Sequence, residues 1–159
     1  MAKLDISGGR LVCRTACEMD GIDVVAVNEP FCDVAYAAYE SKYDSTHGMY
    51  KGTVEVKDGD LVVDGKAIKF FAVRNPPEVP WGACGAGIAC GSTGIFTDIA
   101  KASAHLTGGA KKVLITAPSA DAPTVAMGVN HTAYTKDVNI LSNASCTTNC
   151  LVPLAKIIH

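Results

Sequence analysis

The sequence lacks the features that would direct it to a membrane or to a nucleic acid. No apolar run approaches the roughly 20 residues that a membrane-spanning helix needs. The 14 basic residues are scattered and the formal net charge is −2, so the basic stripe that marks nucleic-acid binding is missing. The first residues carry one lysine and no long apolar core, so no secretory signal is expected. We therefore expect neither a membrane nor a nucleic acid as a partner.

The sequence also lacks a disulfide framework and a metal-binding motif. Its seven cysteines are odd in number and irregular in spacing, which favours reduced thiols and a cytoplasmic location. No cysteine pairs with a nearby histidine in a metal-type spacing, so we predict no metal site. Five of the cysteines are interpreted as small apolar residues: Cys13, Cys17, Cys32, Cys84 and Cys90.

What is present is an alternation of β-branched runs with longer helix-compatible segments. Apolar residues make up 48% of the 159 residues and charged residues 19%, as in one ordinary globular domain. Strands alternating with helices imply parallel pairing, and the turns at 58–59 and 64–65 imply a small antiparallel insertion. The fold class is therefore α/β, a doubly wound, mostly parallel sheet. Strands are expected over 22–27, two segments within 53–63, 68–73, 112–116 and 138–141, and helices over 31–43, over 97–106 and from 147 onward.

Cys146 is the residue whose position most suggests chemistry. It lies just after a predicted strand and just before a predicted helix. The partial positive charge of a helix N-terminus stabilises a thiolate, and the neighbouring hydroxyls of Ser145, Thr147 and Thr148 could bind an oxyanion or a phosphate. A buried structural cysteine in a Ser/Thr-rich cap explains the same position, and position alone does not decide between the two.

Two further observations bear on this cysteine. Cys150 follows one helical turn later and would share a face with Cys146, where packing is the expected role and a resolving thiol the alternative. The histidines are isolated, and none stands at a local spacing to Cys146, so the sequence assigns no general base. We expect most of them at the surface or in caps: His47, His105, His131 and His159.

Two loops could contact a nucleotide. Glu29 closes the strand over 22–27, and an acidic residue at that point of a dinucleotide fold can accept hydrogen bonds from ribose hydroxyls. The run Ser92-Thr93-Gly94 follows an apolar segment as a backbone-rich loop. An ordinary loop explains either feature when it is taken alone.

Several motifs together resemble the glyceraldehyde-3-phosphate dehydrogenase family. Matches in the family's order and at its spacing run from about residue 11 to residue 159. They are YDSTHG from Tyr43, STGIF from Ser92, GGAK from Gly108, APSADAP from Ala117, MGVNH from Met127, and SNASCTTNC from Ser142 continuing into LVPLAKIIH. A resemblance of this length implies a Rossmann-type NAD-binding fold and an oxidoreductase.

The resemblance also implies a reaction. The family oxidises glyceraldehyde 3-phosphate with NAD and inorganic phosphate, and its cysteine thiolate attacks the aldehyde. Cys146 matches that nucleophile, and Ser145 and Thr147 match positions beside the inorganic-phosphate site. The matches on the cofactor side are Gly8, Gly9, Glu29, Arg74, Thr93, Gly94, Phe96 and Ser119.

The sequence departs from the family at the glycine fingerprint. The family has a strand followed by Asn-Gly-Phe-Gly-Arg-Ile-Gly-Arg, whereas this sequence has Ser7-Gly8-Gly9-Arg10. About four residues are missing, among them the middle glycine and the first helical amides that bind pyrophosphate. Four helical residues span roughly 6 Å, so the remaining amides are expected in a different place. Asp5 replaces a family glycine in the first strand, where burial of the charge would be costly, and Gly91 stands where the family often has glutamate.

The family resemblance further implies a chain about twice as long. We expect 1–141 to form the NAD-binding domain and 142–159 the cysteine loop and the start of a catalytic domain. The histidine base, the arginine of the substrate-phosphate site and the asparagine that fixes the nicotinamide belong to the family's second half, as do the contacts of its homotetramer. The 159 residues alone are therefore expected to be inactive. The alternatives are a non-catalytic paralogue that binds a nucleotide or a protein, and an incompletely read sequence.

Overall fold

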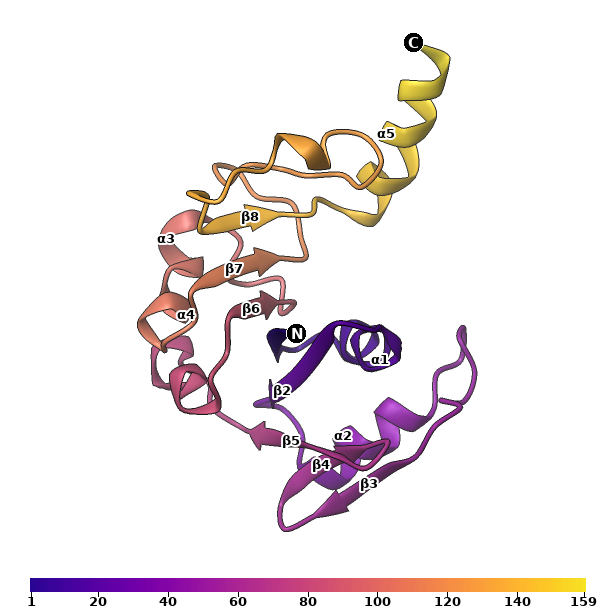
Figure 1. Ribbon diagram of the computed structural model, residues 1–159, viewed down its shortest axis with the longest axis vertical. Coiled ribbons are helices and arrows are strands. Elements are labelled where there is room, and N and C mark those ends of the chain that lie inside the picture. The colour runs from indigo at the N-terminus through magenta and orange to yellow at the C-terminus, as the bar shows by residue number, and fades with distance from the viewer.

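An eight-stranded sheet organises the chain, all 159 residues of which are described by a computed structural model (Figure 1). The strand order is β3-β4-β5-β2-β1-β6-β7-β8, in which β3, β4 and β5 pair antiparallel and the remaining neighbours pair parallel. The strands are β1 (Ala2–Ser7), β2 (Ile22–Asn28), β3 (Val54–Lys57), β4 (Asp60–Val63), β5 (Lys66–Phe71), β6 (Ile88–Gly91), β7 (Lys112–Ile115) and β8 (Ile140–Ser142). The predicted doubly wound α/β class with a small antiparallel insertion is confirmed.

Helices lie on both faces of the sheet. The helices α1 (Arg10–Glu18) and α2 (Val34–Lys42) lie on one face, and α3 (Ile99–Ala102) and α4 (Ala104–Thr107) lie on the other (Figure 1). The short 3₁₀ helices η1 (Pro76–Glu78) and η2 (Trp81–Cys84) share the face of α4, and η3 (His131–Ala133) lies in the loop before β8. The chain closes with α5 (Cys146–Ile158).

The core is divided between these two faces. Ile6, Val24 and Cys90 pack with α1 residues on one side of the sheet. Ala26 and Ala89 belong to the core on the other side, around Trp81. Side chains alternate between the two sides along β1 and β6, whereas Val24 and Ala26 of β2 lie on opposite sides because the pairing of β2 with β1 shifts register between Leu4 and Asp5.

Two polar side chains, Asp5 and His105, are buried on the side of the sheet that carries the core around Trp81. Asp5 is fully buried and neither of its carboxylate oxygens has a hydrogen-bond partner. It lies between Ala26 and Ala89 in the register of the central strands. The expectation that the first strand buries the Asp5 side chain is thus confirmed. His105 is also buried, contrary to the prediction of a surface or capping role, and its Nδ1 accepts a hydrogen bond from Trp81 Nε1 at 3.2 Å.

The helices differ from the sequence predictions in particular places. The helix expected over 31–43 begins only at Val34, because Asp33 caps it by accepting the amide hydrogen of Tyr36. The single helix expected over 97–106 is two short helices with a turn at Ser103, whose hydroxyl donates to the Ala100 carbonyl at 2.6 Å. The predicted stop at 108–109 is confirmed, since α4 ends at Thr107 and Gly109 has a positive φ of 103°.

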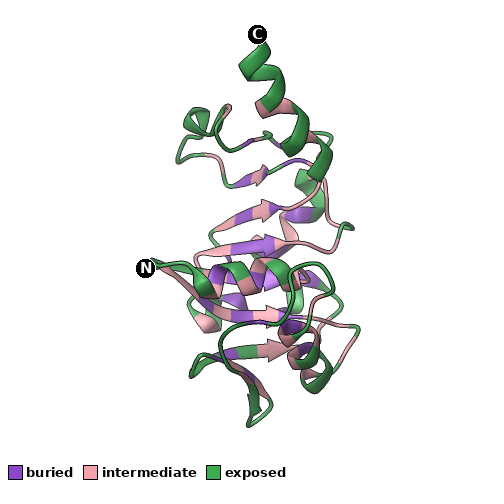
Figure 2. Cartoon of the chain, turned by 90° about the vertical axis from the view of Figure 1, so that its right-hand side faces the viewer, coloured by how far each residue is buried: buried purple, intermediate pink, exposed green.

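The last helix extends beyond the sheet. α5 runs away from β8 toward the C-terminus, and most of its surface is exposed (Figure 2). The exposed apolar side chains include Leu151, Leu154, Ile157 and Ile158. No helix in the structure is both long enough and apolar enough to cross a membrane.

Candidate functional site

The carboxyl ends of β1 and β6 mark the point where the strand order reverses. From β1 the chain continues to β2 on one side, while β6 pairs with β1 on the other. In open α/β sheets, ligands bind in the crevice at this position. The two loops that leave β1 and β6, 8–9 and 92–94, are those that the sequence singled out.

These two loops are in direct contact. The amide of Ser92 donates to the Ser7 carbonyl at 2.8 Å, and the amide of Gly8 donates to the Asn28 carbonyl at 3.0 Å. Gly9 has φ 79°, and a Cβ there would lie 2.5 Å from Ser92 Oγ. Only glycine fits this position, because both the backbone angle and the close approach of the neighbouring loop exclude a side chain.

The shortened fingerprint still presents a helix N-terminus to the crevice. Gly9 is the N-cap of α1 and supplies no capping side chain. The amides of residues 9 to 12 donate to no group of the chain. Free amides at the start of a helix, together with its dipole, bind phosphate groups. This end of α1 therefore provides anion-binding donors in spite of the missing residues.

Glu29 lies beside this helix N-terminus. It follows β2 and lines a small pocket of about 40 Å³ together with Gly8 and Arg10. Glu29 Oε1 accepts a hydrogen bond from the amide of Phe31 at 3.2 Å, and Oε2 accepts none from the chain. The free oxygen can accept hydrogen bonds from ribose hydroxyls.

Asn28 brings Arg74 to the same end of the sheet, a role that the sequence analysis did not identify. The buried Asn28 side chain donates to the Val73 carbonyl and accepts from the Val73 amide, both at 2.9 Å. Arg74 follows directly and is exposed. Glu29 and Arg74 are therefore held on adjoining loops. The sequence feature that could have indicated this role is a polar residue, Asn28, at the end of a buried strand.

Three further residues predicted to contact the cofactor, Thr93, Gly94 and Phe96, differ from one another in their surroundings. Thr93 Oγ1 accepts from the Ile95 amide at 3.4 Å, and Gly94 is exposed. Phe96 is half-buried, and its ring lies edge-on to His105 with centroids 6.0 Å apart. The structure thus keeps Thr93 and Gly94 at the crevice, while Phe96 also packs against α4.

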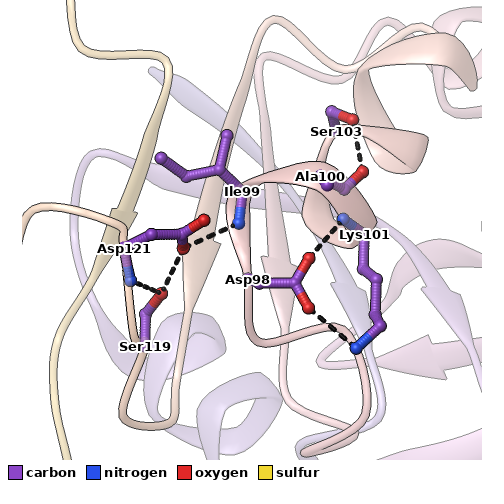
Figure 3. A network of polar contacts seen from close by, with 7 residues as sticks. All are labelled: Asp98, Ile99, Ala100, Lys101, Ser103, Ser119 and Asp121. Atoms are coloured by element: carbon purple, nitrogen blue, oxygen red, sulfur yellow. Dashed lines mark hydrogen bonds and ion pairs between the residues drawn. The ribbon is translucent and has the colours of Figure 1, made fainter.

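Ser119 takes part in a polar network between the loop after β7 and the start of α3 (Figure 3). Its hydroxyl lies 3.2 Å from Asp121 Oδ1, which also accepts from the Ile99 amide at 3.0 Å. Asp98 caps α3 by accepting the amide hydrogen of Lys101 at 2.8 Å. This network fixes the loop that carries Ser119.

Cys146 is the first residue of α5 and is exposed. The turn before it contains Ala144, whose φ of 66° is rare for a residue with a side chain. The buried Ser142 holds this turn, because its Oγ accepts from the Ala144 amide at 2.9 Å and donates to the Ala117 carbonyl at 2.5 Å. Neither role could be found from sequence, since an alanine at this turn carries no glycine or asparagine signal.

Hydroxyl groups surround the start of α5. Ser145 is the N-cap, and its Oγ accepts from the Thr148 amide at 3.0 Å. The same Oγ lies 2.9 Å from Thr147 Oγ1 and 2.8 Å from Thr148 Oγ1. Three hydroxyls and a helix N-terminus next to an exposed thiol can stabilise an anion that forms there.

The other cysteines and histidines add no catalytic partner to Cys146. Cys150 is exposed, so the expectation that it packs against other residues is wrong in this structure. Cys13 and Cys90 are buried as predicted. His131 Nδ1 accepts from the Gly128 amide at 3.0 Å, and no histidine bonds to Cys146. No group of three or more potential metal ligands is present.

The crevice and Cys146 open on the same edge of the sheet. The parallel strands β1, β6, β7 and β8 all end there, and β8 lies three strands from β1. At about 4.8 Å per strand, that is roughly 14 Å between the phosphate-binding amides and the cysteine turn. The free amides, the free oxygen of Glu29 and the exposed thiol therefore lie along one edge of the sheet.

Comparisons with known proteins agree with this geometry. The sequence model of "Glyceraldehyde 3-phosphate dehydrogenase, NAD binding domain" matches residues 6–99. Glyceraldehyde-3-phosphate dehydrogenase from Aspergillus niger is 60% identical over 161 residues, which covers 99% of this chain and 48% of the relative. A second such enzyme, glyceraldehyde-3-phosphate dehydrogenase 2 from Agaricus bisporus, is 58% identical over 163 residues, covering 100% of this chain and 48% of the relative.

The same comparisons bear on the length of the chain and on the fingerprint. The chain spans about half the length of the curated relatives it matches. The Agaricus alignment has 163 positions for the 159 residues of this chain, a difference of four. That difference equals the number of residues by which the glycine fingerprint of this chain is shorter than that of the family.

Proposed function

The chain belongs to the glyceraldehyde-3-phosphate dehydrogenase family, and we propose that it forms the cofactor-binding part of an enzyme that oxidises glyceraldehyde 3-phosphate. NAD is the cofactor of this NAD-dependent oxidoreductase family. We propose which residues hold NAD, that Cys146 is the nucleophile, and that the reaction is phosphorylating. The observation that carries it is the exposed Cys146 at the N-terminus of α5, on the same sheet edge as the nucleotide crevice.

In this proposal, the start of α1 holds the pyrophosphate of NAD. Gly8 and Gly9 allow the backbone to approach it, and the free amides donate hydrogen bonds. Glu29 accepts hydrogen bonds from the adenosine ribose. Arg74, Thr93, Gly94 and Phe96 line the adenine side, and Ser119 approaches from the loop after β7.

Cys146 is the proposed nucleophile. Its thiolate adds to the aldehyde carbon of glyceraldehyde 3-phosphate and forms a hemithioacetal, whose oxygen lies near the hydroxyls of Ser145 and Thr147. The adduct would become a thioester by losing a hydride from its carbon to bound NAD and a proton from its hydroxyl to a base outside these 159 residues. Inorganic phosphate, held beside the same two hydroxyls, then attacks the thioester carbon and releases an acyl phosphate and the thiolate.

We further propose that the chain divides between Leu141 and Ser142. Residues 1–141 build the nucleotide domain, and residues 142–159 carry the cysteine turn toward a catalytic domain. No histidine of this chain reaches Cys146, so the activating base comes from outside the described residues, and these 159 residues alone are expected not to turn over. A glycolytic role in the cytoplasm and assembly as a homotetramer complete the proposal.

The reactivity of Cys146 tests the proposed nucleophile. Iodoacetamide labelling followed by peptide mass analysis compares Cys146 with Cys150, which is also exposed and lies one turn further along α5. Only Cys146 lies at the helix N-terminus, so we expect it to react about tenfold faster. Equal rates for the two thiols would remove the support for a nucleophile at this position, and the Cys146→Ser variant identifies the labelled peptide.

A further inference from the structure

A second cavity lies between α1 and the loop that follows α2. Its volume is about 290 Å³, close to the lower end of the range for small-molecule pockets. The residues that line it are Leu11, Arg14, Thr15, Glu18, His47, Met49 and Lys51.

The wall formed by the loop is fixed by several contacts. Arg10 on α1 forms an ion pair with Asp44 at 2.6 Å, and Asp44 also accepts from the His47 amide at 2.7 Å. The hydrogen bond from His47 is the main reason that the pKa of Asp44 is lowered, so this carboxylate stays ionised and neutralises Arg10. Arg14 donates to the Gly48 carbonyl at 3.1 Å. The cavity is therefore held open between two anchored segments.

Two of the three charged side chains that line the cavity have no partner in the chain, while the Arg14 guanidinium lies over the Tyr50 ring at 5.6 Å from its centroid. Lys51 and Glu18 take part in no ion pair or side-chain hydrogen bond, and Arg14 uses one nitrogen for Gly48 while its charge faces no carboxylate within ion-pair distance. The hydroxyl of Thr15 is also free. A guanidinium and an ammonium that converge with a hydroxyl form a phosphate-binding set.

The same cavity carries one carboxylate and two apolar side chains, which narrows the class of ligand. A carboxylate repels phosphate but accepts hydrogen bonds from hydroxyl groups. Leu11 and Met49 can pack against the C–H groups of a carbon skeleton. We propose that this cavity, defined by Arg14, Glu18 and Lys51, binds a hydroxyl-rich phosphate monoester such as a sugar phosphate. None of these three side chains belongs to the nucleotide crevice or to the Cys146 turn.

Calorimetric titration with three probes tests the assignment. The probes are glucose 6-phosphate, inorganic phosphate and glucose, measured on the full chain at low ionic strength. Saturable one-to-one binding of the sugar phosphate is expected, with weaker binding of phosphate and none of glucose. Absence of saturable binding of glucose 6-phosphate would overturn the proposal, whatever inorganic phosphate does, because phosphate has a second proposed position beside Ser145 and Thr147.

Two substitutions and a control locate the binding. Lys51→Met removes a charge that anchors nothing, and binding of the sugar phosphate should weaken about tenfold, as for the loss of one charge-assisted hydrogen bond. Lys57→Met makes the same change on β3, outside the cavity, and should alter the affinity less than twofold. Equal effects of the two lysine variants would show non-specific attraction and contradict the site.

Substitution of the Glu18 carboxylate tests which class of ligand the cavity binds. Glu18→Gln should reduce the preference for glucose 6-phosphate over inorganic phosphate without weakening phosphate itself. An unchanged preference would leave a plain anion site and overturn the sugar-phosphate assignment. NAD titrated separately tests the nucleotide crevice, so failure of one site is distinguishable from failure of the other.

Discussion

Asp5 is the residue whose burial has the clearest energetic consequence. Its carboxyl is fully buried without a hydrogen-bond partner, and this burial raises its pKa from 3.8 to about 7. Between these values the unfolded chain is ionised at this position while the folded chain keeps its proton. The folded state therefore binds more protons than the unfolded state in this window, so stability falls as the pH rises.

Replacement of Asp5 by asparagine should remove this pH dependence. A shift of about three units corresponds to a loss on the order of 4 kcal/mol between pH 4 and pH 8. Urea unfolding of the parent and of Asp5→Asn at pH 5 and pH 8 should show an advantage of the variant that grows with pH. Asp20→Asn, at an exposed position, is the control, and an advantage independent of pH would refute the buried carboxyl.

At the residue scale, the sequence predicted where the candidate functional residues lie better than it predicted which residues hold them in place. Glu29 and Cys146 are found at the strand end and the helix start where they were expected. Ser142 and Asn28 were missed as positioning residues, because their roles depend on contacts with segments 25 and 45 positions away. His105 was placed at the surface because an isolated histidine in a helical pattern gives no sign of the Trp81 side chain that it meets.

At the scale of elements, the glycine pair after α4 determines how the helix joins the sheet. Gly109 has φ 103°, and a Cβ there would lie 2.7 Å from the backbone of Gly82 in η2. Both the backbone angle and the close approach require glycine. The stop signal read from the sequence thus has a second function, the packing of α4 against the Trp81 segment.

Gly109→Ala should therefore destabilise more than an alanine at an open glycine. The left-handed angle alone costs roughly 1–2 kcal/mol, and the clash with η2 adds about 1–3 kcal/mol. Gly21→Ala is the matched control, since Gly21 has φ 85° and nothing within 4 Å of the added carbon. Thermal unfolding that ranks the two variants equally would contradict the contact with η2.

Most of the sheet was predicted from periodicity, whereas β6 and the early helix were not, and β1 was expected only from the family resemblance. The β-branched run over 22–27 and the Asp58-Gly59 turn carry strong local signals, and β2, β3 and β4 lie within a residue or two of their predicted positions. β8 begins two residues later than predicted. The helix α1 (Arg10–Glu18), which buries Cys13 and Ala16, was not among the predicted helices, although its apolar residues gather on one face.

At the scale of the whole molecule, α5 leaves an apolar surface uncovered. Leu151, Leu154, Ile157 and Ile158 are each more than half exposed. Contiguous apolar surface of this kind favours association. We expect these 159 residues to self-associate in solution. The double variant Leu154→Lys, Ile158→Lys should shift the population toward monomer, which light scattering measures. Met19→Lys is the control at an exposed apolar side chain elsewhere, and a monodisperse monomer of the unsubstituted chain would contradict the expectation.

NAD binding by the shortened fingerprint tests the central claim most directly. Calorimetric titration should give a dissociation constant below about 1 mM, because the free amides of α1 and the free oxygen of Glu29 remain on one sheet edge. Glu29→Gln should weaken NAD several-fold, while Glu55→Gln, on the exposed strand β3, should not. Binding weaker than millimolar, or equal affinities for the two glutamine variants, would contradict the account of this crevice as an NAD site.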